Sequence, residues 1–167
     1  CLEVIRQDYE NKSITDYTYA TNSNDLTKLA TEITTDYLGA KIRESRHYYD
    51  SSPLGSISLG NETKTEQWKS GTSYINTQKT YDPVYGLITS SKDPRGNTIT
   101  YTYYIYNLYP AMVTNPLNQT ISYIYNYSLN KPIQTTDANG FVYQTKYDGL
   151  GRVLEEKVPD SVAPYAP

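Results

Sequence analysis

The fold is decided by residues 81–157, YDPVYGLITSSKDPRGNTITYTYYIYNLYPAMVTNPLNQTISYIYNYSLNKPIQTTDANGFVYQTKYDGLGRVLEEK. Tyrosine recurs in this stretch every 22 residues, at Tyr81, Tyr103, Tyr125 and Tyr147. A fixed period of this length is typical of a repeat array, in which each repeat is one small supersecondary unit that needs its neighbours for stability. The stretch therefore predicts a row of similar units.

A turn signal keeps the same 22-residue period. It is carried by Asp93-Pro94-Arg95-Gly96, Asn115-Pro116-Leu117-Asn118 and Asp137-Ala138-Asn139-Gly140. In such a tetrapeptide the first side chain bonds the backbone, and the last residue accepts a positive φ angle. Asn118 replaces glycine at that last position and is well suited to the same conformation. A second turn is expected in each unit, at Asp82–Gly86 in the first copy and at Asp148–Gly151 in the last.

Alternation between the turns predicts strands. Tyr101 and Tyr103 share one parity, and Thr100 and Thr102 share the other. Side chains of a strand point to opposite faces in turn, so this pattern is typical of a half-buried sheet with one aromatic face. Each unit has room for two strands and two turns. The sequence therefore predicts an all-β protein of consecutive antiparallel hairpins that form an extended sheet.

The chain divides into four parts by pattern. Residues 1–50 carry strand-like runs without a clean period, and residues 51–72 read as an irregular connection punctuated by Gly and Pro. Residues 73–157 hold the repeats, and residues 158–167 read as a flexible tail. Within the connection, short strands are expected around residues 57–59 and 63–68, and Trp68 is expected to anchor the connection on a sheet face.

Three strands are expected before the connection, over residues 12–20, 26–37 and 41–50. The middle run also has a helical spacing, at Leu29, Ala30 and Ile33 among others. Its threonines lose rotamer freedom in a helix. A strand is therefore the favoured interpretation of that run, followed by a turn at residues 38–40.

Composition agrees with β structure and excludes two classes of partner. The 167 residues include 20 tyrosines, and tyrosine and threonine both favour strands. The net charge of -3 and the lack of basic clusters exclude nucleic acid as a partner. No apolar run approaches the length of about 18 residues that a membrane-spanning helix needs. The single cysteine, Cys1, excludes an intrachain disulfide and a thiolate metal cluster.

The segment Tyr147-Asp148-Gly149-Leu150-Gly151-Arg152-Val153 resembles the signature of YD repeats, also called Rhs repeats. Tyr81-Asp82 matches the Tyr-Asp pair directly, whereas the two middle copies depart from it, with Tyr103-Tyr104 and Tyr125-Asn126. The resemblance covers residues 81–157. The repeat-defining positions are taken to be Tyr81, Asp82, Asp93, Gly96, Tyr103, Asn115, Tyr125, Asp137, Gly140, Tyr147, Asp148, Gly151 and Arg152.

The resemblance implies an architecture and a role. Proteins of this family are bacterial Rhs toxins, Tc-toxin components and animal teneurins, in which the repeats form a long curved sheet that spirals into a hollow shell. In the toxins the shell encloses a toxic polypeptide. This chain would then be a non-catalytic piece of the wall of a secreted or cell-surface bacterial protein. Its partners would be the remainder of that protein and the enclosed polypeptide, and its open sheet edges could also associate with other copies.

The sequence offers little for catalysis. His47 is the only histidine, no Gly-x-Ser-x-Gly elbow exists, and His47 is expected to be a plain strand residue. Asp137-Ala138-Asn139-Gly140 resembles the start of a calcium loop but lacks the later ligands. We therefore expect no enzyme activity, no cofactor and no metal.

The tyrosines leave two functions open. A tyrosine face can stabilise the sheet through cross-strand aromatic pairs. An exposed tyrosine stripe could also stack on sugars. The alternative to a shell segment is therefore an adhesin-like surface module that binds glycans or protein through its tyrosines.

Overall fold

The computed structural model describes residues 13–22, 27–104 and 108–159. The described residues form twelve strands and no helix, as predicted. They divide into two compact units, residues 1–98 and residues 99–167, and each is described by itself. Cys1 and most of the predicted tail lie outside the described residues.

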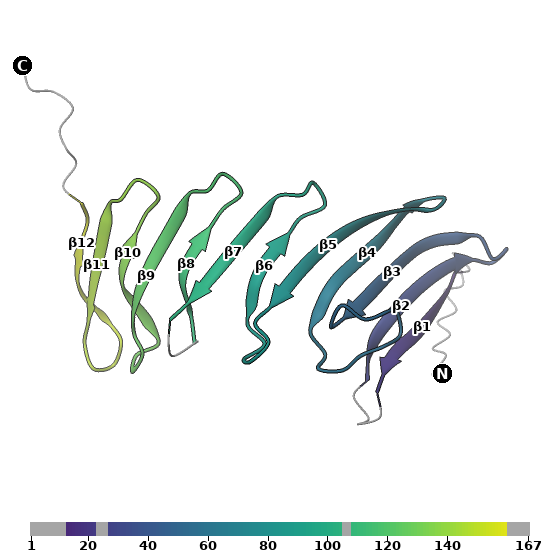
Figure 1. Cartoon of the computed structure of the whole chain (residues 1–167), viewed down its shortest axis with the longest axis horizontal. Helices are drawn as coiled ribbons and strands as arrows, with labels where there is room; N and C mark the ends of the chain where they lie inside the picture. The colour runs from purple at the N-terminus through teal and green to yellow at the C-terminus, as the bar shows by residue number, and fades with distance from the viewer. Residues whose placement is uncertain (1–12, 23–26, 105–107, 160–167) are drawn as a thin grey trace, which may run out of the picture. The chain divides into compact units, whose positions relative to one another are not determined.

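The first unit is an antiparallel meander in which each strand pairs with the next one along the chain (Figure 1). Two of its tight turns bring long strands together, and one connection of more than ten residues separates β3 from β4. The strands are β1 (Ser13–Thr21), β2 (Thr27–Asp36), β3 (Lys41–Tyr49), β4 (Glu62–Ser70), β5 (Ser73–Tyr81) and β6 (Ile88–Lys92).

The second unit repeats the meander with shorter strands. Its first strand is β7, although Thr98, the first residue of β7, is the last residue of the first unit. The strands are β7 (Thr98–Tyr103), β8 (Pro110–Thr114), β9 (Thr120–Asn126), β10 (Lys131–Thr136), β11 (Val142–Tyr147) and β12 (Val153–Lys157). The predicted row of antiparallel hairpins is therefore confirmed in both units.

The strands expected before residue 50 are also confirmed, as β1, β2 and β3. The strand expected around residues 63–68 is confirmed as β4, which is longer and occupies Glu62–Ser70, so the connection before it is shorter than predicted. The residues of β4 are polar on both faces, so no hydrophobic alternation marked it as a long strand. Trp68 lies in β4, within the part of the strand that was expected. The short strand expected around Ile57 is only an isolated bridge between Thr21 and Ser56.

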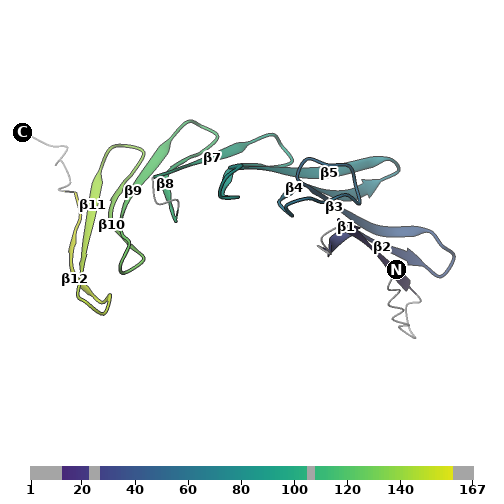
Figure 2. The same ribbon diagram turned by 60° about the horizontal axis from the view of Figure 1, so that its bottom comes forward.

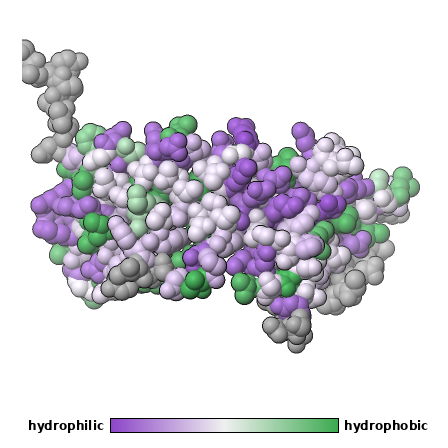
Figure 3. Space-filling view, in the orientation of Figure 1, coloured by the Kyte–Doolittle hydropathy of each residue, from purple (hydrophilic) through white to green (hydrophobic). Residues whose placement is uncertain are grey.

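Little of the molecule is buried, because neither unit has a second sheet packed against it (Figure 2). On the face in view in Figure 3, hydrophobic side chains are scattered among polar ones. The buried hydrophobic residues among those described are Ala20, Ala30, Tyr49, Ile57 and Ala111. The first four form one cluster, in which Ile57 comes from the β3–β4 connection. We call residues 51–60 of this connection the strap.

The predicted alternation of tyrosine and threonine is confirmed in β7 but not throughout β11, where Tyr143 is 40% exposed beside exposed Val142 and Gln144. In β7 the side chains of Tyr101 and Tyr103 are half-buried, whereas Thr100 and Thr102 are exposed. The first unit differs, because aromatic side chains occupy both of its faces. Tyr48 and Tyr49 are adjacent in β3 and therefore point to opposite faces; Tyr48 is half-buried and Tyr49 is 5% exposed.

A β-bulge accompanies each tyrosine of the 22-residue register, and this feature was not predicted. The strand that follows the turn holds one unpaired extra residue opposite the tyrosine. Tyr81 pairs with Ile88 after Thr80 has paired with Ser90, and Tyr103 pairs with Pro110 after Thr102 has paired with Met112. The same shift occurs beside Tyr49, Tyr125 and Tyr147. In the Tyr103 pair the extra residue is Ala111, which is 1% exposed.

Candidate functional site

The predicted turn residues build one turn geometry that occurs five times. In each copy the first residue is Asp or Asn, and its N–H donates to the carbonyl four residues later at 2.9 Å. The N–H of the fourth residue donates back to the first residue's carbonyl at 3.0 Å, and the first side chain accepts the N–H groups of the third and fifth residues. The copies begin at Asp36, Asp93, Asn115, Asp137 and Asp148.

The fourth residue of every copy has a positive φ angle, from +61° at Asn118 to +92° at Gly96. Asp148, which belongs to the Tyr-Asp pair, therefore makes the same turn as Asp93 and Asp137. The turns at Asp93 and Asp137 and the turn of the Tyr-Asp pair at Asp148 look different in the sequence but have the same hydrogen bonds. The same turn therefore occurs at both ends of the hairpins. The copy at Asp36 lies before the regular array; it is the turn expected at residues 38–40, but its likeness to the later turns was not predicted.

Two further aspartates close longer connections in the same way. Asp82 donates its N–H to Leu87 O at 2.8 Å, and its carboxylate accepts the N–H groups of Val84 and Tyr85. Asp50 donates its N–H to Asn61 O at 2.8 Å across the whole strap. An aspartate thus closes the connection after each of the three Tyr-Asp pairs, whatever the length of that connection.

The tyrosine of each Tyr-Asp pair fastens its strand to the preceding one. The hydroxyl of Tyr49 donates to Leu29 O at 2.8 Å, that of Tyr81 to Glu62 O at 2.9 Å, and that of Tyr147 to Pro132 O at 3.1 Å. Each acceptor lies near the start of the strand before the tyrosine's own. Both side chains of the pair are therefore engaged in holding the sheet together.

Before two of these three acceptors, Leu29 and Pro132, stands a lysine that lies close to the same tyrosine and its turn. Lys28 Nζ is 5.7 Å from the centre of the Tyr49 ring and donates to Gly60 O at 2.9 Å. Lys131 Nζ is 5.0 Å from the Tyr147 ring and donates to Gly151 O. A lysine ammonium over an aromatic ring is attractive, and here it also satisfies a turn carbonyl.

The copy at Tyr125 departs from this arrangement in sequence and in structure. Tyr109 replaces the lysine, 22 residues before Lys131, and stacks on Tyr125 with ring centres 4.9 Å apart. Tyr123 and Tyr127 lie within 6.2 Å of the Tyr125 ring centre. Burial raises the pKa of the Tyr125 hydroxyl. This site is therefore a cluster of tyrosine rings.

A charged cluster occupies one face of β3, β4 and β5. Its centre is Glu44, which is only 3% exposed and accepts hydrogen bonds from Lys41 at 2.6 Å, Arg46 at 2.5 Å and Tyr74 at 2.7 Å. Burial alone would raise the pKa of Glu44, but these donors outweigh it and lower the pKa to about 2. A carboxylate that is 3% exposed and accepts three hydrogen bonds from its own sheet is structural, since its burial leaves no access for a substrate.

Cations cover the aromatic rings of the same face. Arg46 lies 4.2 Å from the Tyr74 ring centre, Lys64 lies 3.7 Å from that of Tyr48, and Lys41 lies 4.7 Å from that of Trp68. Such rings are shielded from stacking with a ligand. Trp68 also donates its Nε1–H to Gly71 O at 2.9 Å, so its indole anchors the β4–β5 turn.

The described residues hold no arrangement suited to catalysis. His47 is a strand residue in β3, as predicted, and its Nδ1 lies 2.6 Å from Glu62 Oε1. No group of three or more His, Cys, Asp or Glu side chains that could hold a metal occurs in the described part of the chain. The carboxylates of Asp93 and Asp148 have lowered pKa values because they accept hydrogen bonds within their own turns.

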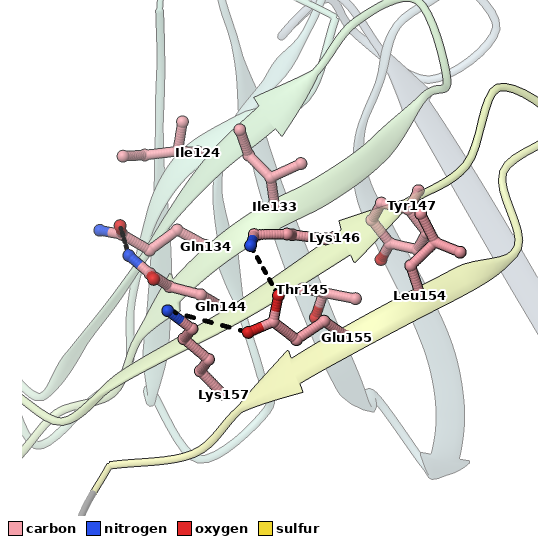
Figure 4. Close-up of a pocket in the computed structure, with 10 residues that line it drawn as sticks. All are labelled: Ile124, Ile133, Gln134, Gln144, Thr145, Lys146, Tyr147, Leu154, Glu155 and Lys157. Carbon is pink, nitrogen blue, oxygen red and sulfur yellow. Dashed lines mark hydrogen bonds and ion pairs between the residues drawn. The ribbon is translucent and has the colours of Figure 1, made fainter.

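One hollow of about 410 Å³ lies on the second unit, over β9 to β12 (Figure 4). Gln144 donates to Gln134 across it at 3.2 Å, and Glu155 pairs with Lys146 at 2.6 Å and with Lys157 at 3.8 Å. The Gln, Lys and Glu side chains that line the hollow are thus engaged with one another. The remaining lining residues are Ile124, Ile133, Thr145, Tyr147 and Leu154.

The geometry defines a class of protein: single-layer sheets of antiparallel hairpins, closed by Asx turns and fastened by tyrosine. A solved structure of TcdB2-TccC3 has this fold, with a TM-score of 0.68, 12% sequence identity and a match over 87% of this chain. The chain spans 11% of the length of that protein. This likeness of fold supports the resemblance to YD and Rhs repeats.

A solved Photorhabdus luminescens Tc holotoxin pore is also similar over 87% of the chain, at 13% identity, but its TM-score of 0.33 is too low to support an argument. No protein-family model matches the sequence. No curated protein sequence matches it either. No helix among the described residues is long and apolar enough to cross a membrane.

Proposed function

We propose that this chain is a non-catalytic segment of a bacterial YD/Rhs-repeat protein, and that its strands form part of the wall of a shell that encloses a toxin polypeptide. One observation carries the proposal. In all three Tyr-Asp pairs the tyrosine hydroxyl bonds the preceding strand and the aspartate closes the following connection. The most distinctive residues of the repeat therefore serve the sheet and leave no group for chemistry.

The open construction of both units supports a wall. A sheet with few buried hydrophobic side chains gains little from the hydrophobic effect on its own. It is stabilised when neighbouring units and an enclosed chain cover more of it. The fold likeness to TcdB2-TccC3, a protein of which this chain spans a tenth, agrees with a segment of a larger assembly. Secretion or display at a bacterial cell surface follows from the same proposal, as do the parent protein and its enclosed polypeptide as partners.

The coding sequence on both sides of this chain tests the proposal. We expect further units in which a tyrosine precedes Asp or Asn and the next turn follows about 11 residues later, the spacing of Asp137 and Asp148. Beyond the last unit we expect a domain without the repeat. Flanking sequence with a different periodicity on both sides would contradict a shell segment.

A second candidate function rests on the tyrosine cluster around Tyr125. Its rings pack on one another, and Tyr143 on β11 is 40% exposed. Exposed tyrosine rings can stack on sugars, so the alternative is an adhesin-like module that binds glycans. A glycan array separates the two functions. A wall segment gives no signal, whereas an adhesin binds a defined glycan and loses that signal in Tyr143→Ala but not in Tyr85→Ala, an exposed turn tyrosine of the first unit.

A further inference from the structure

The strap is the one connection that folds back onto a sheet face. Ile57 at its middle is 6% exposed and packs with Ala20, Ala30 and Tyr49. Asn22 Nδ2 donates to Ser58 O at 3.1 Å. These contacts hold the ten residues of the strap over β1, β2 and β3. The short hairpin turns of the described chain are instead mostly exposed to solvent.

The end of the strap converges on a single carboxylate. Asp50 Oδ2 accepts the N–H groups of Ser58 at 2.8 Å, Leu59 at 2.9 Å and Gly60 at 3.0 Å, and Asp50 Oδ1 accepts that of Asn61 at 2.9 Å. Successive backbone N–H groups that point to one place form a nest, which binds anions. The five short turns give their Asp or Asn only two N–H groups each, so the Asp50 arrangement is more than an Asx turn.

The charge of Asp50 fits this environment. Burial alone would raise its pKa, but the hydrogen bonds from the strap backbone lower the pKa to about 2. The residue is held at a φ of +55°, a conformation that costs energy for a residue with a side chain. Asp50 therefore keeps an unfavourable backbone conformation, in which its carboxylate is bound by the nest.

We propose that the backbone of residues 58–61 is a carboxylate-binding site, that Asp50 is its built-in ligand, and that this occupancy keeps the strap closed over Ala20, Ala30 and Tyr49. Two consequences follow. Removal of the Asp50 carboxylate opens the strap while the sheet remains paired, because β3 and β4 keep their own hydrogen bonds. The vacated nest then accepts a small free carboxylate such as formate, and the strap closes again.

The variant Asp50→Gly separates the carboxylate from the backbone. Glycine adopts a positive φ without strain, so the substitution removes the ligand and relieves the backbone together. Chymotrypsin cleavage after Leu54 or Leu59, followed by mass spectrometry, reports strap opening. We expect cleavage about tenfold faster or more in Asp50→Gly, since charge-assisted hydrogen bonds contribute roughly 1.5–3 kcal/mol. Sodium formate slows this cleavage, and sodium chloride at equal ionic strength does not.

Two controls keep the test decisive. Asp93→Gly makes the same change in a turn with only two N–H donors, and strap cleavage there stays at the wild-type rate. Asp50→Asn fills the nest with a neutral amide, so we expect intermediate cleavage and no response to formate. Hydrogen exchange of β4 and β5 amides shows that the sheet is intact in each variant. An Asp50→Gly strap as resistant as wild type, or equal protection by formate and chloride, overturns the proposal.

Discussion

The two units use the same turns but stabilise their faces by different means. The first unit has strands of nine or ten residues in five of its six cases, a cluster of charges around Glu44, and cations over its aromatic rings. The second has strands of five to seven residues, and its most central ring, Tyr125, packs against other tyrosines. The difference teaches that the repeat specifies hairpins and turns and leaves the face chemistry free to vary.

The same comparison explains where the period is visible. In the second unit the turns at Asn115 and Asp137 keep the 22-residue spacing, and the period extends back to Tyr81 and Asp93 of the first unit. In the first unit the strap adds residues after Asp50, and the Asp82 turn is one residue longer than the common form. An insertion in a turn breaks the regular spacing in the sequence, so the repeat is harder to recognise. It does not change how the strands pair, because each strand pairs only with its neighbours.

Acid should separate the units most strongly. The pKa values of Glu44 and Asp50, both in the first unit, are lowered to about 2 from ordinary values of 4.5 and 3.8. Because the folded-state values are the lower ones, these groups stabilise the fold above their ordinary pKa and stop doing so as pH falls through their folded pKa. We expect Trp68 fluorescence, which reports the first unit, to change between about pH 4 and pH 2.

The second unit lacks a carboxylate of that kind among its described residues, since the lowered pKa values of half-buried Asp148 and exposed Glu155 are smaller shifts. Hydrogen exchange of β9 and β10 amides over the same pH range should therefore change less. Loss of hydrogen-exchange protection in both units over the same pH range would show that their stabilities are coupled. Glu44 would then not make the first unit more sensitive to acid than the second.

Neutralising Glu44 should give the largest effect of a single substitution. Glu44 is 97% buried, and Glu44→Gln leaves Lys41 and Arg46, whose side chains are 29% and 30% exposed, without their shared anion; breaking a buried ion pair costs about 3–5 kcal/mol, and we expect the lower end of that range. Urea unfolding followed by Trp68 fluorescence measures it. The matched control is Glu155→Gln on the second unit, an exposed ion pair with Lys146 for which we expect little change, because solvent screens such pairs.

Tyr125→Ala should weaken the second unit through packing. The change removes a half-buried ring that contacts three other tyrosines, so we expect a loss of about 2–3 kcal/mol, less than for a fully buried aromatic ring. Hydrogen exchange of β9 and β10 amides measures the loss. Thr102→Ala, on an exposed position of β7, should cost little. Equal costs for the two variants would show that the tyrosine cluster is not what holds this face together.

Tyr81→Phe and Tyr147→Phe test the one tyrosine contact common to both units. Each removes only a hydroxyl that donates to a backbone carbonyl, at 2.9 Å and 3.1 Å. We expect a loss of about 1–2 kcal/mol in each unit, since the carbonyl loses its partner. Urea unfolding measures both, and Tyr85→Phe in an exposed turn is the control. A loss in only one unit would show that the Tyr-Asp pair does not have one role throughout the chain.

The sequence predicted the features that depend on short-range chemistry. Asp, Asn and Gly at fixed offsets determined the turns, and Tyr-Thr alternation determined the strands of the second unit. It did not predict contacts between residues far apart in the chain, such as Tyr74 with Glu44 or Tyr147 with Pro132. One sequence signal of such contacts was available, because Tyr109 and Lys131, which each lie beside a repeat tyrosine, are 22 residues apart. A search for identical residues overlooks this pair because the two side chains differ. The strap was read as an irregular connection because its single buried residue, Ile57, has no periodic partner.

Gly39→Ala and Gly140→Ala test whether one turn serves both units. The two glycines occupy the same position in the turns at Asp36 and Asp137, with φ angles of +84° and +87°. A methyl group at either position would meet nothing within 4 Å, so only the backbone conformation opposes it. We therefore expect the same loss of about 1 kcal/mol in each, measured by urea unfolding. Gly149→Ala, at a glycine of the Asp148 turn without a positive φ, is the control and should cost less. Unequal losses at Gly39 and Gly140 would show that the cost of this turn depends on its surroundings. The turn could then not be treated as one backbone feature that is independent of the side chains on each sheet face.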